Sequence, residues 1–297
     1  MYVIFGASGN TGGEIAKQLL AAHQKVRVVG RDSNKLQALT TKGADAAIGD
    51  LHDAEFLNRA LAGAKAVYAL IPPQYRAADF RAYQNAVGKL MADAIQKQGV
   101  KYVVHLSSVG ADVPDGTGPI AGLHDQEQRL NAIKNVHVLH LRAAYFMENF
   151  LAGIGMIKTM GINGSAMKGD AKFAMIATRD IAAYATARLH KLDFQGQGVQ
   201  YLLGERDLTV SEATRAIGKV IGKPDLPYVQ FSYDQAQEGL TQMGLSPDVA
   251  KGFVEMSRAF NEGKIKVPKR DAKNTTPTSI ETFAAELFAK AYGQQSN

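Results

Sequence analysis

Residues 1–15 read Met1-Tyr-Val-Ile-Phe-Gly-Ala-Ser-Gly-Asn-Thr-Gly-Gly-Glu-Ile15, and this stretch decides the fold. Its apolar start, residues 2–5, has no polar face, which is typical of a strand buried on both sides in a parallel sheet. A glycine-rich turn follows, and then an amphipathic helix that is predicted to begin near Glu14, with Ile15 and Leu19 on its apolar face. The sequence therefore predicts a strand, a tight turn and a helix, the opening unit of an α/β nucleotide-binding fold.

The glycines of the turn are spaced Gly6-x-x-Gly9-x-x-Gly12, and each has a physical use in binding a dinucleotide. Gly6 allows a tight turn, Gly9 lets the backbone approach a pyrophosphate, and Gly12 lets the helix pack closely on the strand. The helix N-terminus adds unpaired N–H groups and the positive end of its dipole. Side-chain donors stand at the same place: Ser8, Asn10 and Thr11. We therefore expect the pyrophosphate of a nicotinamide dinucleotide here, rather than a merely flexible loop.

The spacing Gly-x-x-Gly-x-x-Gly differs from the Gly-x-Gly-x-x-Gly of many dehydrogenases. It resembles the short-chain dehydrogenase/reductase superfamily, in particular its extended and atypical members.

The whole chain has the composition of an ordinary globular protein, with 297 residues, 46% of them apolar and 21% charged. No apolar run approaches the ~20 residues that a membrane span needs, and the N-terminus enters the first strand without a basic signal-like segment. The chain has no cysteine, which excludes disulfides, thiolate metal sites and a cysteine nucleophile. We expect a cytoplasmic protein that does not attach to a membrane.

The net charge of +6 does not by itself indicate nucleic-acid binding, because Lys and Arg are scattered and no run exceeds Lys269-Arg270. A basic surface that attracts an anionic cofactor explains the charge equally well. His137 and His140 are three apart on a predicted strand, so they face opposite sides and cannot share a metal ion. We expect no direct nucleic-acid contact and no metal site.

The second predicted strand, residues 25–29, is followed by Arg31 and Asp32, at a position that selects the cofactor. An acidic side chain there hydrogen-bonds the ribose hydroxyls of NAD, whereas an arginine accommodates the 2′-phosphate of NADP. Arg31 follows Gly12 by 19 residues, close to the usual spacing of ~20, and Lys35 lies one helical turn further on. Asp32 argues for NAD, and a solvated surface role for Arg31 stays open. We expect NADP(H) to be preferred over NAD(H).

The third and fourth predicted strands also end at candidate cofactor residues. Residues 44–48 lead into Asp50 and Leu51, where the adenine is expected at the carboxyl edge of the sheet. Asp50 could accept a hydrogen bond from the adenine, cap the helix that begins near Asp53, or do both. Residues 65–71 lead into Pro72 and Pro73, which fix the backbone and form a stiff wall beside the cofactor.

Strand and helix patterns alternate along the rest of the first two hundred residues. Helices are predicted over 77–98 and 178–191, and strands over 100–106, 135–141 and 200–203. This alternation predicts right-handed βαβ units, and therefore an α/β fold with a Rossmann-type, doubly wound parallel sheet. A smaller, mostly helical C-terminal lobe is expected beyond residue 209.

We expect residues 1–150 to form the NAD(P)-binding domain, with residues 171–205 completing its sheet. Residues 151–170 and 206–297 are expected to form the smaller lobe, which would bind a substrate or a partner. Residues 150–170 carry five glycines and three methionines, a composition that suits an adaptable apolar pocket wall. Residues 264–277 are polar and predicted to be an exposed loop.

Several stretches together resemble the NmrA-like family of atypical short-chain dehydrogenases/reductases. They are Gly6–Gly12, Arg31, Gly49-Asp50-Leu51, Ser107-Ser108, Arg142–Phe150, Arg179-Asp180-Ile181-Ala182 and Thr276-Pro277-Thr278-Ser279. The resemblance covers most of the chain. The family includes NADPH-dependent quinone reductases, azoreductase-like proteins and NADP-sensing transcriptional regulators.

The resemblance implies a set of cofactor contacts at the matching positions. Arg31 and Lys35 would bind the 2′-phosphate, and Asp50 with Leu51 would bind the adenine. The nicotinamide side would be lined by Ile71 and Pro72, with Tyr145, Phe146 and Met147 near the ring.

One departure from ordinary short-chain dehydrogenases bears on the chemistry. Those enzymes use a Tyr-x-x-x-Lys pair on the helix after the serine strand, where the lysine lowers the tyrosine pKa. The corresponding residues 122–130 contain neither a tyrosine nor a lysine, and Tyr184 with Arg188 lies on a helix well beyond the sixth strand. A typical alcohol or ketone dehydrogenase is therefore disfavoured, as is a sugar-nucleotide epimerase, which relies on the same pair.

Three residues remain as candidates for catalysis: His124, Ser107 and Tyr145. His124 could donate a proton to a quinone oxygen, because imidazole titrates near neutral pH, or it could only hydrogen-bond locally at a helix start. Ser107, after the fifth strand, is a candidate for both proton transfer and cofactor contact. Tyr145 could stack on a substrate or belong to the core, and Asn149 could orient a ligand or cap a turn.

We expect an NADPH-dependent oxidoreductase that transfers hydride to a quinone-like or other electron-poor small molecule. Quinones need little acid catalysis, because their reduced form is aromatic and stable, so the missing Tyr-Lys pair does not exclude this reaction. The alternative is a non-catalytic NADP(H) redox sensor that acts through a protein partner. A homodimer is equally open.

Overall fold

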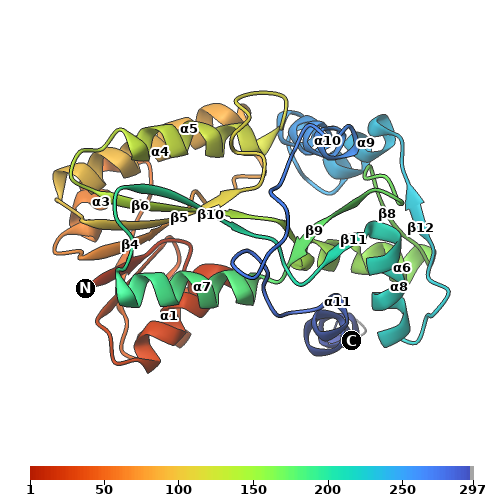
Figure 1. Ribbon diagram of the computed structural model, residues 1–297, viewed down its shortest axis with the longest axis horizontal. Helices are drawn as coiled ribbons and strands as arrows, with labels where there is room; N and C mark the ends of the chain where they lie inside the picture. The colour runs from red at the N-terminus through yellow and green to blue at the C-terminus, as the bar shows by residue number, and fades with distance from the viewer. Residues whose placement is uncertain (295–297) are drawn as a thin grey trace.

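The structure is a computed structural model, and it describes residues 1–294. Its central sheet consists of β1 (Tyr2–Ile4), β2 (Val26–Gly30), β3 (Asp45–Ile48), β4 (Ala66–Ala69), β5 (Tyr102–Ser108), β6 (His137–Ala143) and β10 (Gln197–Leu202). These seven strands are ordered β10-β6-β5-β4-β1-β2-β3 (Figure 1), and all their pairings are parallel. The chain winds outward from β1 to β3 and then returns to β4 on the other side of β1. The predicted α/β, doubly wound fold is confirmed, and its ligand-binding crevice is expected where this winding reverses.

Helices cover both faces of the sheet (Figure 1). One face carries α1 (Asn10–Ala21), α2 (Ser33–Thr40) and α7 (Thr178–Lys191), and the other carries α3 (Ala54–Leu61), α4 (Phe80–Lys97) and α5 (Pro119–Asn131). Successive residues of a strand face opposite sides, so Ile4 packs in the core under α1 while Val3 packs in the core under α3 and α4. Because both faces are covered, residues 2–4 show no polar alternation.

The helix α1 begins at Asn10, four residues before the start predicted near Glu14. Its first turn contains Gly12 and Gly13, which carry no side chain that could contribute to an apolar periodicity. The helical pattern in the sequence therefore becomes visible only after the helix has begun.

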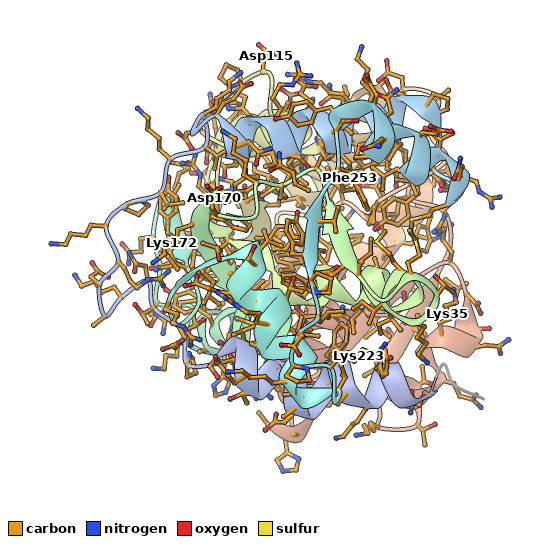
Figure 2. The ribbon with its side chains drawn as sticks, turned by 90° about the vertical axis from the view of Figure 1, so that its right-hand side faces the viewer. Lys35, Asp115, Asp170, Lys172, Lys223 and Phe253 are labelled. Atoms are coloured by element: carbon orange, nitrogen blue, oxygen red, sulfur yellow. The ribbon has the colours of Figure 1, made fainter. Side chains whose placement is uncertain are left out.

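The remaining elements form a second lobe at the carboxyl edge of the sheet (Figure 1). They are β7 (Tyr145–Phe146), the 3₁₀ segment η1 (Met147–Gly153), α6 (Ile154–Met160), β8 (Asn163–Ser165), β9 (Lys172–Ile176), β11 (Asp207–Thr209), α8 (Val210–Val220), β12 (Tyr228–Gln230), α9 (Tyr233–Gln242), α10 (Pro247–Asn261), α11 (Ile280–Phe283), the π-helical segment η2 (Ala284–Phe288) and α12 (Ala289–Gln294). The lobe, which faces the viewer in Figure 2, has its own apolar core, which includes Met147, Phe150, Ile217 and Phe283.

The structure adds one detail to the predicted organisation and corrects another. The lobe also contains small sheets, β11-β9-β7 and β12-β8, and four of their five strands have only two or three residues, too few to show a period of two in the sequence. Of residues 171–205, only β10 joins the central sheet, because its pairing with β6 occupies the free edge of that sheet and β9 pairs in the lobe instead. The division of the chain into two domains stays a prediction.

Hydrogen bonds attach the lobe at several places along the carboxyl edge of the sheet. Near the start of α7, Asp180 accepts hydrogen bonds from the backbone N–H and hydroxyl of Thr278 at 2.9 and 2.6 Å. Near the start of α4, Asp248 on α10 accepts from the backbone N–H of Phe80 at 2.8 Å. The hydroxyl of Ser246 also donates to the Ala77 carbonyl at 2.6 Å. The α9–α10 hairpin is therefore fixed against the loop that follows β4.

The segment 264–277 is irregular, as predicted, but it is not wholly exposed. Asn274 and Thr276 are only 6% and 8% exposed. The Asn274 carbonyl accepts from the backbone N–H of Leu203 at 2.8 Å, and the Thr276 N–H donates to the Gly204 carbonyl at 3.2 Å. The polar composition suggested solvent, whereas the backbone of this segment is tied to the end of β10. No helix within residues 1–294 has the length and apolar character needed to cross a bilayer.

Candidate functional site

The glycine turn after β1 has the geometry that a close approach to phosphate requires. Gly6 has a φ of +64°, a conformation that side chains other than that of glycine rarely adopt. The backbone N–H of Gly9 donates to the Gly6 carbonyl at 2.9 Å, which closes the turn. A Cβ atom on Gly12 would lie 2.5 Å from the Gly6 oxygen, so only glycine lets α1 pack this closely on the turn.

The donors at the start of α1 are of two kinds. Ser8, Gly9 and Asn10 are exposed, and the first backbone N–H groups of a helix have no partner within the helix. Thr11 is buried instead, and its hydroxyl interacts with the phenol of Tyr68. The backbone amides, Ser8 and Asn10 therefore fit a pyrophosphate, whereas the side chain of Thr11 faces the interior and stabilises the fold.

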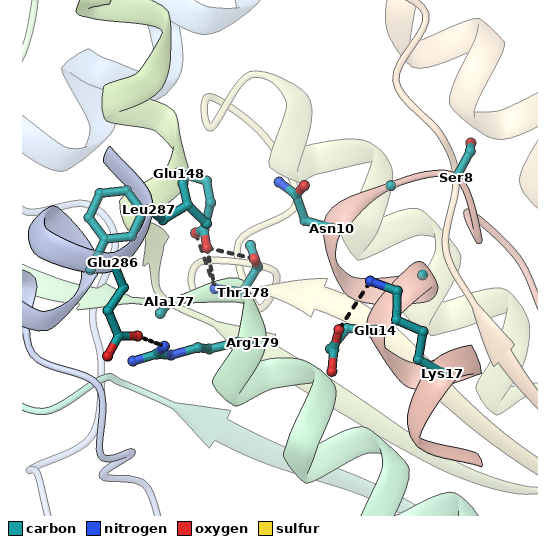
Figure 3. Close-up of a pocket in the computed structure, with 13 residues that line it drawn as sticks. Ser8, Asn10, Glu14, Lys17, Glu148, Ala177, Thr178, Arg179, Glu286 and Leu287 are labelled. Atoms are coloured by element: carbon teal, nitrogen blue, oxygen red, sulfur yellow. Dashed lines mark hydrogen bonds and ion pairs between the residues drawn. The ribbon is translucent and has the colours of Figure 1, made fainter. Parts of the chain in front are cut away.

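A cavity of about 320 Å³ opens beside this turn (Figure 3). The turn and α1 contribute one wall, and the start of α7 with η2 contributes the other. The lining residues are Ser8, Gly9, Asn10, Gly13, Glu14, Lys17, Glu148, Ala177, Thr178, Arg179, Phe283, Glu286 and Leu287.

The polar groups on the α7 wall of this cavity already have hydrogen-bond or ion-pair partners within the protein. Glu148 accepts from the backbone N–H of Thr178 at 3.0 Å and from its hydroxyl at 2.6 Å (Figure 3). Burial raises the pKa of Glu148, although these hydrogen bonds oppose that shift. Arg179 forms an ion pair with Glu286. The free anion-binding groups therefore lie on the α1 wall.

The ends of β2 and β3 bring Arg31 and Asp50 to the same edge. The backbone N–H of Gly49 donates to the Gly30 carbonyl at 3.1 Å, which places the two strand ends side by side. Arg31 is exposed and forms no hydrogen bond or ion pair with any residue from 1 to 294. Lys35, in the first turn of α2, is also exposed. Both cations are available to a phosphate group.

Asp32, the residue that argued for NAD, has a structural role. Its carboxylate accepts from the backbone N–H of Asn34 at 2.9 Å, so it is the N-cap of α2. The acidic group is therefore engaged by the helix while its neighbour Arg31 remains free. This arrangement leaves Arg31, rather than Asp32, available to a ligand.

The suggested capping role of Asp50 is wrong. Asp53 is the N-cap of α3, where its carboxylate accepts from the backbone N–H groups of Glu55 and Phe56 at 2.8 and 3.1 Å. An N-cap side chain must reach the second or third amide of its helix, and Asp50 lies too far before α3. It accepts instead from the backbone N–H of His52 at 3.0 Å, and Leu51 packs partly on the core beneath α3.

The expected nicotinamide side combines partly buried and buried residues. Ile71 and Pro72 are partly buried at the end of β4. Tyr145 packs edge-on against Phe173, with ring centroids 5.5 Å apart, and burial raises its pKa to about 12. Phe146 packs against the core beneath α1 and α7, and Met147 is buried in the core of the lobe. The phenol of Tyr145 is therefore no acid near neutral pH, and the side chain of Met147 does not reach the surface.

The candidates for proton transfer differ in their surroundings. His124, on α5, is partly buried and its Nδ1 lies 2.8 Å from the Ala111 carbonyl. That contact makes Nδ1 the donor and leaves Nε2 as the nitrogen that can exchange a proton. Ser107 is only 2% exposed, and its hydroxyl donates to Glu127 at 2.5 Å. Ser107 therefore lies within β5, and its hydroxyl belongs to a buried hydrogen-bond network. Asn149 is exposed and interacts with Tyr145.

The sequence analysis missed a buried polar cluster between the sheet and α5. Arg142 on β6 donates to Glu127 at 2.7 Å and to the Tyr201 hydroxyl at 2.9 Å. Deeper in the sheet, the Nδ1 atoms of His105 and His140 lie 3.0 Å apart. We refer to Ser107, Glu127, Arg142, His105, His140 and Asn131 as the α5 cluster.

The hydrogen-bond network assigns the tautomers of this cluster. Asn131 Oδ1 lies 2.9 Å from His140 Nε2, so that nitrogen carries a proton and His140 Nδ1 accepts from His105. Burial lowers the pKa of His140 to about 4 and lowers that of His105 well below its ordinary range. Two patterns in the sequence pointed to the cluster: polar residues two apart on β5 and β6, and Glu127 with Asn131 four apart on α5.

Within residues 1–294, no three His, Cys, Asp or Glu side chains are arranged to hold a metal ion.

Similarity to proteins of known name extends over the whole chain. A curated relative, the NAD(P)H azoreductase of Xenophilus azovorans, is 27% identical over 292 residues, which cover 98% of each chain. An NADPH-dependent quinone oxidoreductase of Escherichia coli, solved in complex with NADPH, has a TM-score of 0.79 at 22% identity and covers 97% of this chain and 100% of its own. The triphenylmethane reductase of Citrobacter sp., solved with NADP(H), has a TM-score of 0.78 at 19% identity and covers 95% of this chain and 98% of its own.

At these identities the two solved structures show that the fold is shared. The family is shown by the sequence itself, since the profile of the NmrA-like family matches residues 2–292. The strand–turn–helix unit at residues 2–21, the arginine after β2 and the match along nearly the whole chain agree: this protein belongs to the NmrA-like family.

Proposed function

We propose that this protein is an oxidoreductase that uses NADPH, in preference to NADH, to reduce a quinone-like or other electron-poor small molecule. The observation that carries the proposal is the combination of the glycine turn with an unpartnered Arg31 at the end of the next strand. The curated relative is named an NAD(P)H azoreductase, and the solved neighbours are named a quinone oxidoreductase and a triphenylmethane reductase. The three names refer to azo, quinone and triphenylmethane compounds, all of them unsaturated or aromatic small molecules, which supports the acceptor class.

Different residues of this chain bind different parts of the cofactor. The amides at the start of α1 hold the pyrophosphate, Arg31 and Lys35 hold the 2′-phosphate, and Asp50 accepts from the adenine. Ile71, Pro72 and the ring of Tyr145 form the wall of the nicotinamide side. Bound NADPH supplies the hydride.

The protein's contribution to proton transfer is assigned to His124. A quinone that accepts a hydride also takes up one proton to become the hydroquinone. The Ala111 carbonyl accepts the Nδ1 proton of His124, so Nε2 is the nitrogen that would donate to the acceptor. Ser107 and Tyr145 are poor donors, because the first is bonded to Glu127 and the pKa of the second is raised to about 12.

The substitution His124→Ala tests this assignment. We expect turnover to slow by a factor of about 10² or more, the usual range for loss of a general acid, with NADPH affinity nearly unchanged. The matched control is His190→Ala, which removes an exposed histidine from the last turn of α7. If the rate is unaltered, the acceptor takes its proton from solvent and His124 only anchors α5.

One observation favours a second function, that of a non-catalytic NADP(H) sensor. The groups expected to bind the cofactor are free, whereas two of the three candidate proton donors are engaged or held neutral. A sensor must bind the two redox forms with different affinities, because a ligand shifts an equilibrium only by its differential affinity.

The deciding experiment pairs binding with turnover. NADPH, NADP and NADH are titrated separately, and NADPH consumption is followed by its near-ultraviolet absorbance with a panel of quinones. Acceptor-dependent consumption supports the reductase. Tight binding with no turnover on any acceptor, and unequal affinity for NADPH and NADP, supports the sensor.

A further inference from the structure

Tyr83 lies on a helix, but its side chain contacts the segments that follow two strands of the central sheet, β3 and β4. It lies in the first turn of α4, and its hydroxyl donates to the Pro72 carbonyl at 2.8 Å, at the end of β4. On the other side its ring approaches the imidazole of His52, which follows β3, with ring centroids 5.6 Å apart and planes tilted by 40°. The phenol thus bridges the space in front of β1 and β2, which lie between β4 and β3 in the sheet.

Two charged groups act across the same space. Burial raises the pKa of Tyr83, the charge of Arg31 opposes that shift, and the carboxylate of Asp50 reinforces it. Asp50 also lies 3.5 Å from Nδ1 of His52. A cation after β2, a carboxylate and an imidazole after β3, and a phenol from α4 therefore converge at the carboxyl edge of the sheet.

These four residues are accessible, which distinguishes them from a structural cluster. The side chains of Asp50 and His52 are 68% and 48% exposed, Arg31 is exposed, and Tyr83 is partly buried. The α5 cluster, by contrast, places its carboxylate and its histidines out of solvent. An exposed group of aromatic rings and charges suits a ligand with a flat ring and an anionic substituent.

The phenol ring is held rigidly in place. Phe80 stacks on Tyr83 with centroids 6.1 Å apart and planes within 16°. Phe80 is itself buried, and its backbone N–H is bonded to Asp248 of α10. A wall that is fixed before the ligand arrives loses little entropy on binding.

We propose that His52 and Tyr83 form the aromatic wall against which the adenine ring of NADP(H) packs, between the carboxylate of Asp50 and the 2′-phosphate site at Arg31. The identity of the cofactor rests on the proposed function. In this arrangement Arg31 binds the 2′-phosphate and Asp50 accepts a hydrogen bond from the adenine amino group. The two aromatic rings cover the face of the base.

The test uses half of the cofactor, so that no reaction is involved. Adenosine 2′,5′-bisphosphate and 5′-AMP are titrated by calorimetry into the wild-type protein and into Tyr83→Leu, His52→Ala and Arg31→Ala. Tyr83→Phe is the matched variant that keeps the ring, and His190→Ala is the control for loss of an exposed histidine far from the site.

The expected losses of affinity distinguish the two aromatic rings from Arg31, which binds the phosphate. Tyr83→Leu weakens binding of both ligands by roughly tenfold, as loss of a stacking ring on a base does, and His52→Ala weakens both by a smaller factor. Arg31→Ala weakens only the bisphosphate. Tyr83→Phe and His190→Ala bind both ligands as the wild type does.

Two outcomes would overturn the proposal, in distinguishable ways. Wild-type affinity in both Tyr83→Leu and His52→Ala, with a selective loss in Arg31→Ala, removes the aromatic wall and leaves the proposed cofactor intact. A wild-type protein that binds neither the bisphosphate nor NADPH overturns the proposed function as well. If Tyr83→Leu unfolds, as judged by circular dichroism, His52→Ala decides alone, because His52 is exposed and its loss does not disturb the core.

Discussion

The carboxyl edge of the sheet and the α5 cluster are built from similar residues and behave in opposite ways. At the edge, Arg31 and Asp50 are exposed and Arg31 has no partner within residues 1–294. In the α5 cluster, Arg142 and Glu127 form a buried ion pair at 2.7 Å, with side chains only 13% and 2% exposed. Polar groups that the protein satisfies internally hold its elements together, whereas those that it leaves open are available to a ligand.

The comparison also explains why Ser107 and His124 differ, although both were expected to act on the ligand. Ser107 lies in the α5 cluster and its hydroxyl is bonded to Glu127. His124 is one helical turn before Glu127, and only its Nδ1 is bonded, to the Ala111 carbonyl. Nε2 of His124 has no hydrogen-bond partner within residues 1–294, and in this respect His124 resembles Arg31 rather than Ser107.

The largest expected effect comes from breaking the α5 cluster. Glu127→Ala should lower the free energy of unfolding by about 3–5 kcal/mol, because it leaves Arg142 buried without its carboxylate. Urea denaturation measures this change. The matched control is Glu286→Ala, which breaks the exposed pair with Arg179 and should cost no more than about 1 kcal/mol. Equal losses in the two variants would show that burial does not separate the two kinds of pair.

A second effect concerns pH and the histidines of the α5 cluster. The folded pKa of His140 is about 4, against an ordinary value of 6.5, so between these values the folded state binds fewer protons than the unfolded state. Stability is therefore unaffected by this group above about pH 6.5 and falls as the pH drops, by about 3 kcal/mol at pH 4. Unfolding free energies measured from pH 7 to pH 4 test this. His140→Gln, which keeps a donor for Asn131, should lose much of the slope; an unchanged slope would assign it to other groups.

At the edge, the expected effects are on affinity rather than on stability. Arg31→Ala should weaken NADPH binding by about 1.5–3 kcal/mol, the range for hydrogen bonds to a charged group, and leave NADH binding nearly unchanged. Fluorescence titration of both cofactors measures the difference. Lys42→Ala removes the same charge from an exposed position after α2 and serves as the control. Equal weakening for both cofactors would mean that Arg31 does not read the phosphate.

The smallest expected effect concerns Asp32, the residue beside Arg31. Asp32→Ala should lower the unfolding free energy by about 1 kcal/mol, because it removes the N-cap of α2. The ratio of NADPH to NADH affinity should stay the same. Asp32→Asn keeps a side chain that caps equally well and should recover the stability. A selective loss of NADH binding in Asp32→Ala would instead identify Asp32 as a ligand of the ribose hydroxyls.

Most of the central fold was predictable because its information is local. Gly6, Gly9 and Gly12 lie within seven residues of one another, and the buried strands appear as short apolar runs between helices. Arg31 was identified by counting from Gly12, since the strand–helix–strand unit has a nearly constant length. The helix of residues 178–191 was predicted within its observed bounds, because its apolar periodicity is long enough to be read.

Other features depended on residues that are far apart in the chain. Ser107 and Glu127 are separated by 20 residues and His105 and His140 by 35, so no pattern along the sequence states that they touch. Arg142 and Tyr201 are separated by 59 residues, and their hydrogen bond likewise appears only in the folded chain. The approach of His52 to Tyr83 required the packing of α4 beside the end of β3.

The sequence by itself determined the α/β class, the position of the glycine turn and the arginine after β2, because each follows from the chemistry of a few neighbouring residues. Tertiary structure alone decided which polar side chains are satisfied and which are open, because that depends on what each one meets when the chain is folded. Ser107 and Arg31 illustrate the two cases. The hydroxyl of Ser107 is hydrogen-bonded to Glu127 of another element, whereas Arg31 has no partner within residues 1–294.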